Sequence, residues 1–287
     1  LFDYKSNKII WADSWLENWD TLSMIEQKIS SNVIKILDSD SIQKNQYENL
    51  AYIDSSAYKI YLKGKYIYHN RESDEDIIKA KSLFEKSINL DANLTQPRTL
   101  LGEIYFNWGK YDKSLEVHNR NLKISRNLDD SKSIANSLSS IAGVYFTKGE
   151  YDQSLEYNLK ALKIRESNNS KKGVARSYNS IGAIHDVLGE HKKALNHYKV
   201  SLKIVERIND KKGIMRAKIN ISNLYNTTGE YKKALESNRL CIDLCKKSNN
   251  FPLLAYSYNL SGVIYNNLSD YDESIKNLKK SLKIKRE

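Results

Sequence analysis

Proline and glycine are scarce in this chain of 287 residues, which contains two prolines and 11 glycines. Sandwiches and barrels of short strands need turn residues at every reversal, so this scarcity argues against an all-β fold and against Pro-rich or Gly-rich linkers. It suits long helices joined by short turns. Hydrophobic residues make up 40% of the chain and charged residues 28%, which is enough apolar material for a core and argues against wholesale disorder.

Cysteines and long apolar runs are also few. The two cysteines, Cys241 and Cys245, cannot form a disulfide framework, and no apolar run approaches the roughly 18 residues that a membrane helix needs. We therefore expect a cytoplasmic protein that is neither secreted nor inserted in a membrane. The chain begins with Leu1 and stops inside a helical pattern that lacks a stop signal, so we also expect it to be a piece of a longer protein.

What the chain does have is a period of 40 residues. The period shows in a glycine column, in an aromatic column two residues later, and in a small-residue column upstream of the glycine. The columns are Gly109, Gly149, Gly189, Gly229 and Ser269; then Tyr111, Tyr151, His191, Tyr231 and Tyr271; and Gly102, Ala142, Gly182, Ser222 and Gly262. Five copies in register indicate a repeat protein rather than chance.

Each copy predicts a pair of helices. Leu138, Ile141 and Tyr145 fall at i, i+3 and i+7, which places them on one face of a helix. The stretch 151–164 has a second amphipathic pattern, and the Lys-Gly-Glu sequence at 148–150 predicts a tight turn between the two. We therefore expect an antiparallel helix pair in each repeat.

These columns resemble the tetratricopeptide repeat, which has a small residue in its first helix, a Gly-x-Tyr turn and small residues in its second helix. The resemblance implies an all-α, right-handed superhelical solenoid of about six helix pairs, with a short α+β remnant at the N-terminus. Residues 51–287 would form the repeat domain. Its expected repeats are 51–92, 95–130, 131–170, 171–210, 211–250 and 251–287.

Residues 1–50 do not follow the repeat. Short apolar runs at 1–4 and 8–12 predict a small hairpin, and the pattern over 21–37 predicts a helix. The segment Ile9-Ile-Trp-Ala-Asp13, with Trp15 and Trp19 after it and Leu62-Lys-Gly-Lys-Tyr66 further on, resembles the end of a TolB-like domain joined to tetratricopeptide repeats. That resemblance implies a bacterial signalling protein, in which the module upstream is often an adenylate or guanylate cyclase and sometimes a winged helix or a kinase.

The positive charge suggests a partner class. The formal net charge of +11 arises in residues 61–287, largely as lysine pairs such as Lys192-Lys193. Nucleic-acid binding would need basic and aromatic residues to converge on one surface, whereas the recurring tyrosines fall in packing columns, so we do not expect a nucleic-acid partner. A solvated lysine-rich surface explains most of this charge.

A sharper hypothesis concerns the first helix of each pair, since its non-core face lines the concave groove in tetratricopeptide proteins. Amide side chains can grip the backbone of an extended peptide, and Arg176 with Arg216 could bind carboxylates. We therefore expect a groove for a peptide or partner protein, with acidic character, although asparagine is also abundant elsewhere in the chain. The expected groove residues are Arg176, Asn179, Asp186, Arg216, Asn220, Asn223, Asn226, Asn259, Asn266 and Asn267.

Candidate catalytic and metal-binding residues are few. Cys241 and Cys245 lie four apart on one helical face, but Cys241 falls in a small-residue column, so we expect buried packing thiols rather than metal ligands. His118, His185 and His191 fall in packing columns, and His197 is expected to be exposed. No phosphate-binding loop, zinc-protease motif or nucleophile elbow occurs, so we expect no enzyme activity in this segment and no cofactor. Uncovered repeat ends would favour self-association.

Overall fold

The computed structural model describes residues 2–3, 8–9 and 55–286, and these residues form twelve helices and one short strand pair. Strands β1 (Phe2–Asp3) and β2 (Lys8–Ile9) pair antiparallel, with Phe2 opposite Ile9. The helix expected over 21–37 lies outside the described residues. The chain divides into two compact units, Leu1–Asn107 and Trp108–Glu287.

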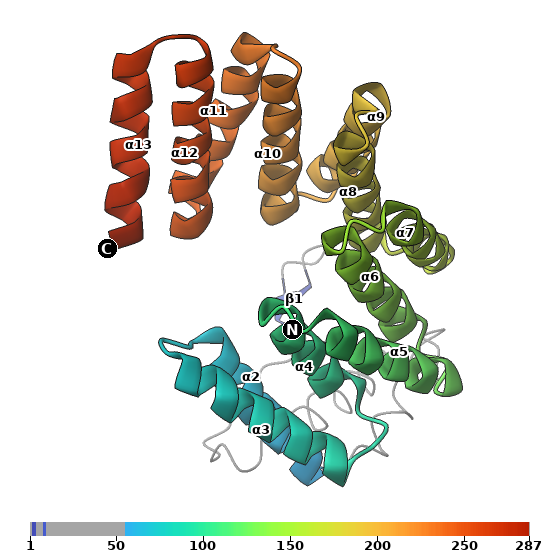
Figure 1. Cartoon of the computed structure of the whole chain (residues 1–287). Coiled ribbons are helices and arrows are strands. Elements are labelled where there is room, and N and C mark those ends of the chain that lie inside the picture. The colour runs from blue at the N-terminus through green and yellow to red at the C-terminus, as the bar shows by residue number, and fades with distance from the viewer. Residues whose placement is uncertain (1, 4–7, 10–54, 287) are drawn as a thin grey trace. The chain divides into compact units, whose positions relative to one another are not determined.

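The helices of the first unit are α2 (Ser55–His69), α3 (Asp74–Leu90) and α4 (Thr95–Asn107). Those of the second unit are α5 (Tyr111–Asn127), α6 (Ser131–Thr147), α7 (Tyr151–Ser167), α8 (Lys171–Val187), α9 (His191–Arg207), α10 (Lys211–Thr227), α11 (Tyr231–Lys247), α12 (Phe251–Asn267) and α13 (Tyr271–Arg286). Consecutive helices pack as pairs, α6 with α7 through α12 with α13 in the second unit (Figure 1) and α2 with α3 in the first. The expected all-α repeat fold is confirmed. The range 95–130 supplies α4 to the first unit and α5 to the second.

A residue with left-handed backbone conformation follows the C-terminal end of most helices of the second unit. Gly149 has φ +79° after α6, and Asn169 has φ +52° after α7. Gly189 and Asn209, and then Gly229 and Asn249, repeat this alternation, while Ser269 takes the place of the glycine after α12. After α6 the amide of Glu150 donates to the carbonyl of Tyr145 at 2.9 Å, and the amide of Gly149 donates to that of Phe146 at 3.1 Å. This pair of bonds is the Schellman motif, which satisfies carbonyls at the helix end and needs a left-handed residue. The glycine column therefore reflects turn geometry.

The small-residue columns lie where helix backbones approach each other. Ser154 Oγ of α7 donates to the carbonyl of Ala142 of α6 at 2.8 Å, and Ser201 Oγ of α9 donates to the carbonyl of Ala175 of α8 at 2.8 Å. A Cβ atom on Gly182 would lie 2.7 Å from the Tyr198 ring, so α8 approaches α9 closely at this point. The short side chains both permit the approach and bond across it.

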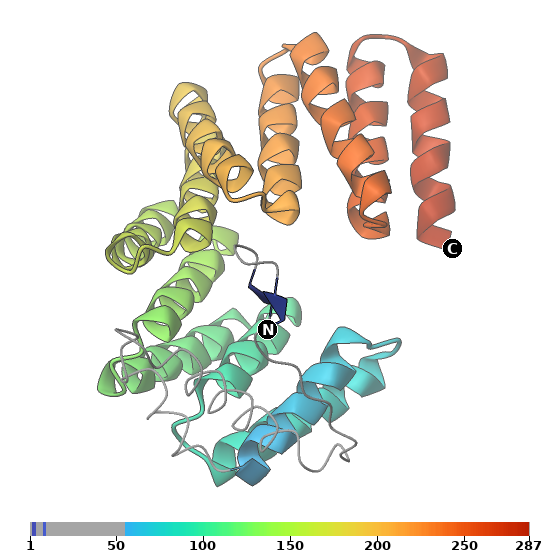
Figure 2. The same cartoon turned by 180° about the vertical axis from the view of Figure 1, so that it is seen from behind.

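The apolar core is divided into clusters along the second unit. One cluster joins Leu122 of α5, Leu138 and Ile141 of α6 and Ala161 of α7, and a similar cluster joins Met215 and Ile219 of α10 to Cys241 of α11. Each cluster therefore links neighbouring helices, which is the expected pattern of a repeat stack. Figure 2 shows this adjacency from behind, with α12 beside α13 at the C-terminal end.

Candidate functional site

The first helices α8, α10 and α12 of the second unit lie next to one another. Helix α10 contacts α8 and α12 directly, in addition to contacting the second helices of its own and the preceding repeat. We call the side chains on α6, α8, α10 and α12 that lie outside the packing columns the first-helix face. All the expected groove residues lie on three of these helices: Arg176, Asn179 and Asp186 on α8; Arg216, Asn220, Asn223 and Asn226 on α10; and Asn259, Asn266 and Asn267 on α12.

Asparagines link successive first helices. Asn220 Nδ2 of α10 donates to Asn179 Oδ1 of α8 at 3.0 Å. One repeat further on, Asn267 Nδ2 of α12 donates to Asn226 Oδ1 of α10 at 2.9 Å. The structure therefore brings four of the expected residues together as two bridges. Each bridging amide still has a donor or acceptor to offer to a ligand, because an amide group has two of each.

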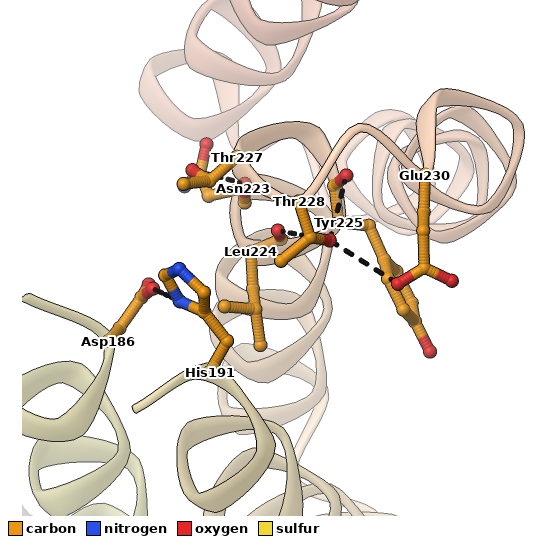
Figure 3. A network of polar contacts seen from close by, with 8 residues as sticks. All are labelled: Asp186, His191, Asn223, Leu224, Tyr225, Thr227, Thr228 and Glu230. Carbon is orange, nitrogen blue, oxygen red and sulfur yellow. Dashed lines mark hydrogen bonds and ion pairs between the residues drawn. The ribbon is translucent and has the colours of Figure 1, made fainter. Parts of the chain in front are cut away.

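The remaining asparagines differ in their surroundings. Asn223 Nδ2 donates to the Tyr256 hydroxyl of α12 at 3.1 Å, which makes a third link between first helices. Asn259 and Asn266 are exposed. Figure 3 shows Asn223 with Thr227 one turn further along α10, where the Thr227 hydroxyl donates to the Asn223 carbonyl at 3.1 Å.

The two arginines occupy the same column, one repeat apart. Arg176 of α8 and Arg216 of α10 are both exposed. On the same two repeats, Lys172 Nζ lies 3.1 Å from Asp210 Oδ2. Burial favours the neutral form of Asp210, but the bonds from Lys172 and the Gly213 amide, with the charges of Lys172 and Arg216, lower the pKa of this carboxyl. Asp210 is therefore an anion at neutral pH and offsets part of the local positive charge.

A cavity of about 510 Å³ opens between α10 and α12. Its lining combines an apolar wall with cations and amides: Lys212, Arg216, Ile219, Asn220, Asn250, Pro252, Leu253 and Tyr256. No carboxylate belongs to this lining. Two expected residues, Arg216 and Asn220, are therefore at a cavity that suits an anionic group attached to an apolar one. Sequence reasoning missed Lys212, Pro252 and Tyr256, which the 40-residue register would have placed in the same columns.

Asp186 faces the inside of its own repeat. Its Oδ1 lies 3.3 Å from His191 Nδ1 (Figure 3), and its carboxylate interacts with the Tyr198 hydroxyl. Burial raises the pKa of Asp186, while the contacts to His191 and Tyr198 oppose the rise. The same interactions raise the pKa of Tyr198, burial contributing most. Asp186 thus interacts across the α8–α9 pair rather than with the first-helix face.

The expectation that His197 is exposed is wrong. The His197 ring is half-buried and stacks between two rings of α8, those of His185 at 5.1 Å and Tyr178 at 5.8 Å between centroids. Burial lowers the pKa of His197, and the neighbouring His185 lowers it further. The stack occupies the position that Tyr145 and Tyr157 fill one repeat earlier, with centroids 5.5 Å apart. His197 therefore serves packing, as do the other histidines of the columns.

The cysteines are buried packing thiols. Cys241 Sγ and Cys245 Sγ lie 3.8 Å apart, and Met215 Sδ lies 3.3 Å from Cys245 Sγ. Burial raises the pKa of both thiols, that of Cys245 to about 12. Over the part of the chain that the structure describes, no group of three or more His, Cys, Asp or Glu side chains is placed to hold a metal ion. Nor does any helix in that part have the length and apolar character to cross a membrane.

The repeated helix pairs and their shared first-helix face define an α-solenoid repeat protein. Tetratricopeptide repeat profiles match residues 94–167, 133–207 and 255–287, which together make up just over half of the chain. The chain belongs to the tetratricopeptide repeat family. The resemblance expected from the columns is thereby confirmed for the repeats, while the TolB-like resemblance of the N-terminal part stays a prediction.

Solved structures share this fold at low sequence identity. A Rap protein complexed with competence and sporulation factor is 16% identical, with a TM-score of 0.64 over 95% of this chain and 88% of that chain. The apo form of RapI is 19% identical, with a TM-score of 0.61 over 80% and 98%. BtubC from P. vanneervenii is 18% identical, with a TM-score of 0.57 over 81% and 89%. A comparison with curated protein sequences gave no match.

Proposed function

We propose that this chain is a protein-interaction scaffold whose first-helix face binds an extended acidic peptide or an acidic segment of a partner protein. The observation that carries the proposal is the cavity between α10 and α12, because cations, amides and an apolar wall meet there without a carboxylate. Two asparagine bridges on α8, α10 and α12 offer groups that pair with a peptide backbone. A neighbour of the same fold, the Rap protein, was solved in complex with a factor, which supports binding as the use of this fold.

The test is selection from a random peptide library displayed on phage, with the purified chain as bait. We expect acidic sequences to be enriched and their binding to fall at least tenfold in the variant Arg176→Glu plus Arg216→Glu, because reversing both charges repels carboxylates. The matched control is Arg120→Glu plus Arg239→Glu. It reverses the same number of positive charges, at exposed sites of the second helices α5 and α11. Equal loss in both variants would indicate a net-charge effect and would contradict the groove. Nucleic acid retained at low salt and released at high salt, with no peptide enriched, would contradict it as well.

We further propose that the chain acts in the cytoplasm as part of a bacterial signalling protein. The support is the resemblance of residues 1–92 to TolB-like regions that precede tetratricopeptide repeats. A cyclase with these repeats as its sensor region is the alternative function in this setting. Sequencing the gene upstream and assaying the full-length product for cyclic nucleotide synthesis tests both ideas. An upstream region without a cyclase, winged-helix or kinase module would contradict the signalling proposal.

Self-association is a second proposed mode of interaction, with another copy of this chain as the partner. It is supported by an apolar face on α13 that includes Ile275 and Leu282, both exposed. The equivalent residues of earlier repeats pack against the next first helix. A first helix of a second copy would therefore fit the apolar face of α13.

A further inference from the structure

A buried arginine breaks the repeat pattern in α7. The equivalent positions of three other repeats hold Ser125, Val205 and Cys245, which are buried and uncharged, and that of α13 holds Lys285, which is exposed. In α7 this position holds Arg165, whose exposure is only 6%. Packing does not require a guanidinium there, because the three other repeats that bury this position do so with an uncharged side chain. The substitution therefore calls for a chemical explanation.

The Arg165 guanidinium extends from α7 into the layer of first helices. Nη1 donates to Ser177 Oγ of α8 at 2.7 Å. Nη2 donates to two oxygens of α6, the Ala135 carbonyl at 3.4 Å and Asn136 Oδ1 at 3.3 Å. The bonds of Nη2 are at the long end of the hydrogen-bond range, so this nitrogen is less well satisfied than Nη1.

The positive charge of Arg165 has no counter-ion among the described residues. All three of its acceptors are neutral, and burial with the nearby charge of Arg176 lowers the pKa of Arg165 to about 10. Neither Arg165 nor Arg176 takes part in an ion pair within the part of the chain that the structure describes. A buried charge that meets only neutral dipoles is unfavourable, and an added anion would relieve it.

The backbone of α8 holds this side chain in place. Gly173 lies beside the Arg165 stem: a Cβ atom there would come within 2.9 Å of Arg165 Cδ and 3.0 Å of Cγ. The absence of a side chain at Gly173 therefore leaves room for the arginine. The guanidinium ends beside Asn136 of α6 and bonds to Ser177, the residue that follows Arg176 on α8. Asn136 and Arg176 share one column of the first-helix face with Arg216.

We propose that Arg165 and Arg176 together bind a carboxylate side chain of the acidic peptide, with Arg176 meeting it at the surface and Arg165 replacing its long bond to the neutral oxygen of Asn136 by an ion pair with the carboxylate. The inference rests on the proposed function and adds a second anion subsite, one repeat before the cavity that Arg216 lines. Two guanidinium groups present paired donors that match the two oxygens of a carboxylate.

The experiment uses the whole chain, with fluorescein-labelled hexaglutamate as the probe and hexaglutamine as the uncharged comparison. Arg165→Met should weaken hexaglutamate binding about tenfold, since it removes one charged bond. The same variant should unfold at a higher urea concentration without peptide, because it removes an unpaired buried charge. Hexaglutamate should raise the urea midpoint of the wild type more than that of the variant. Arg239→Met, which removes one exposed charge from α11, should change binding less than twofold.

The outcomes separate the two proposals. A less stable Arg165→Met protein that binds hexaglutamate like the wild type would show a structural guanidinium and overturn the inference, as would a wild type that does not prefer hexaglutamate to hexaglutamine. If Arg176→Glu plus Arg216→Glu abolishes peptide binding and Arg165→Met leaves it unchanged, the groove stands and only the Arg165 subsite falls. Should Arg165→Met fail to fold, Gly173→Ala keeps the charge but displaces the side chain, and unchanged hexaglutamate binding there would overturn the inference.

Discussion

At the scale of single residues, the burial of His118 in α5 makes the stability of the fold depend on pH. Its side chain is 2% exposed and its Nδ1 lacks a hydrogen-bond partner. Burial lowers the pKa of His118 to about 4. Between this value and the ordinary 6.5 the unfolded chain binds a proton that the folded chain does not, so stability from this residue is complete above pH 6.5 and falls as the pH decreases toward 4.

The first prediction follows from this shift. Between pH 7 and pH 5 the wild type should lose about 2 kcal/mol more unfolding free energy than His118→Asn. Asparagine is the residue that the same column holds at Asn158 and Asn238, both buried, so the variant keeps a side chain that the repeat accepts. Urea unfolding of both proteins at the two pH values measures the difference. Equal losses would show that His118 titrates normally in the folded state.

Other residues show what a sequence pattern cannot reveal. The columns predicted that Arg176 and Arg216 would be exposed on one face, because exposure follows from helical register. They did not predict the environment of Arg165, since a buried arginine and a snorkelling one look alike in a sequence. The stack of His185 on His197 could have been expected from Tyr145 and Tyr157 one repeat earlier, had both columns been followed together.

At the scale of one element, two glycines of α6 and its turn have opposite roles. Gly149 has φ +79° and Gly143 lies within the helix, and a Cβ atom at either would meet no atom within 4 Å. Gly149→Ala should lower the unfolding free energy by about 1 kcal/mol, because alanine is strained in the left-handed region. Gly143→Ala should raise it by about 0.5–1 kcal/mol through helix propensity. Urea unfolding of the two variants tests the pair, and a change of the same sign in both would contradict it.

The elements themselves were predicted well from the sequence. Helices with a hydrophobic face at i, i+3 and i+7 and a left-handed residue at each end are determined locally, so the helix pairs from α6 to α13 follow from the columns. The asparagine bridges were not predicted, because Asn179 and Asn220 are 41 residues apart and meet only when neighbouring first helices pack. Register places such residues on a face, whereas side-chain partners depend on the distance between helices.

At the scale of the whole molecule, a repeat stack is stabilised by contacts between neighbours, so the apolar face of a second helix is normally covered by the next first helix. Leu122 and Leu162 are 6% and 8% exposed in their repeats, whereas Leu282 in the same column of α13 is 48% exposed and Ile275 is 51% exposed. Apolar side chains gathered on one helix favour association with a matching surface.

The last prediction concerns this face of α13. Light scattering of the wild type at increasing concentration should show a mass that rises above 33.2 kDa, and Ile275→Gln plus Leu282→Gln should hold the mass at the monomer value. The matched control is Leu159→Gln plus Leu240→Gln, which removes leucines of similar exposure, 49% and 48%, from α7 and α11. These leucines lie on separate helices and form no common face, so their loss should leave association unchanged. A wild type that stays monomeric at every concentration would contradict self-association through α13, and equal effects in both variants would assign it to general hydrophobicity.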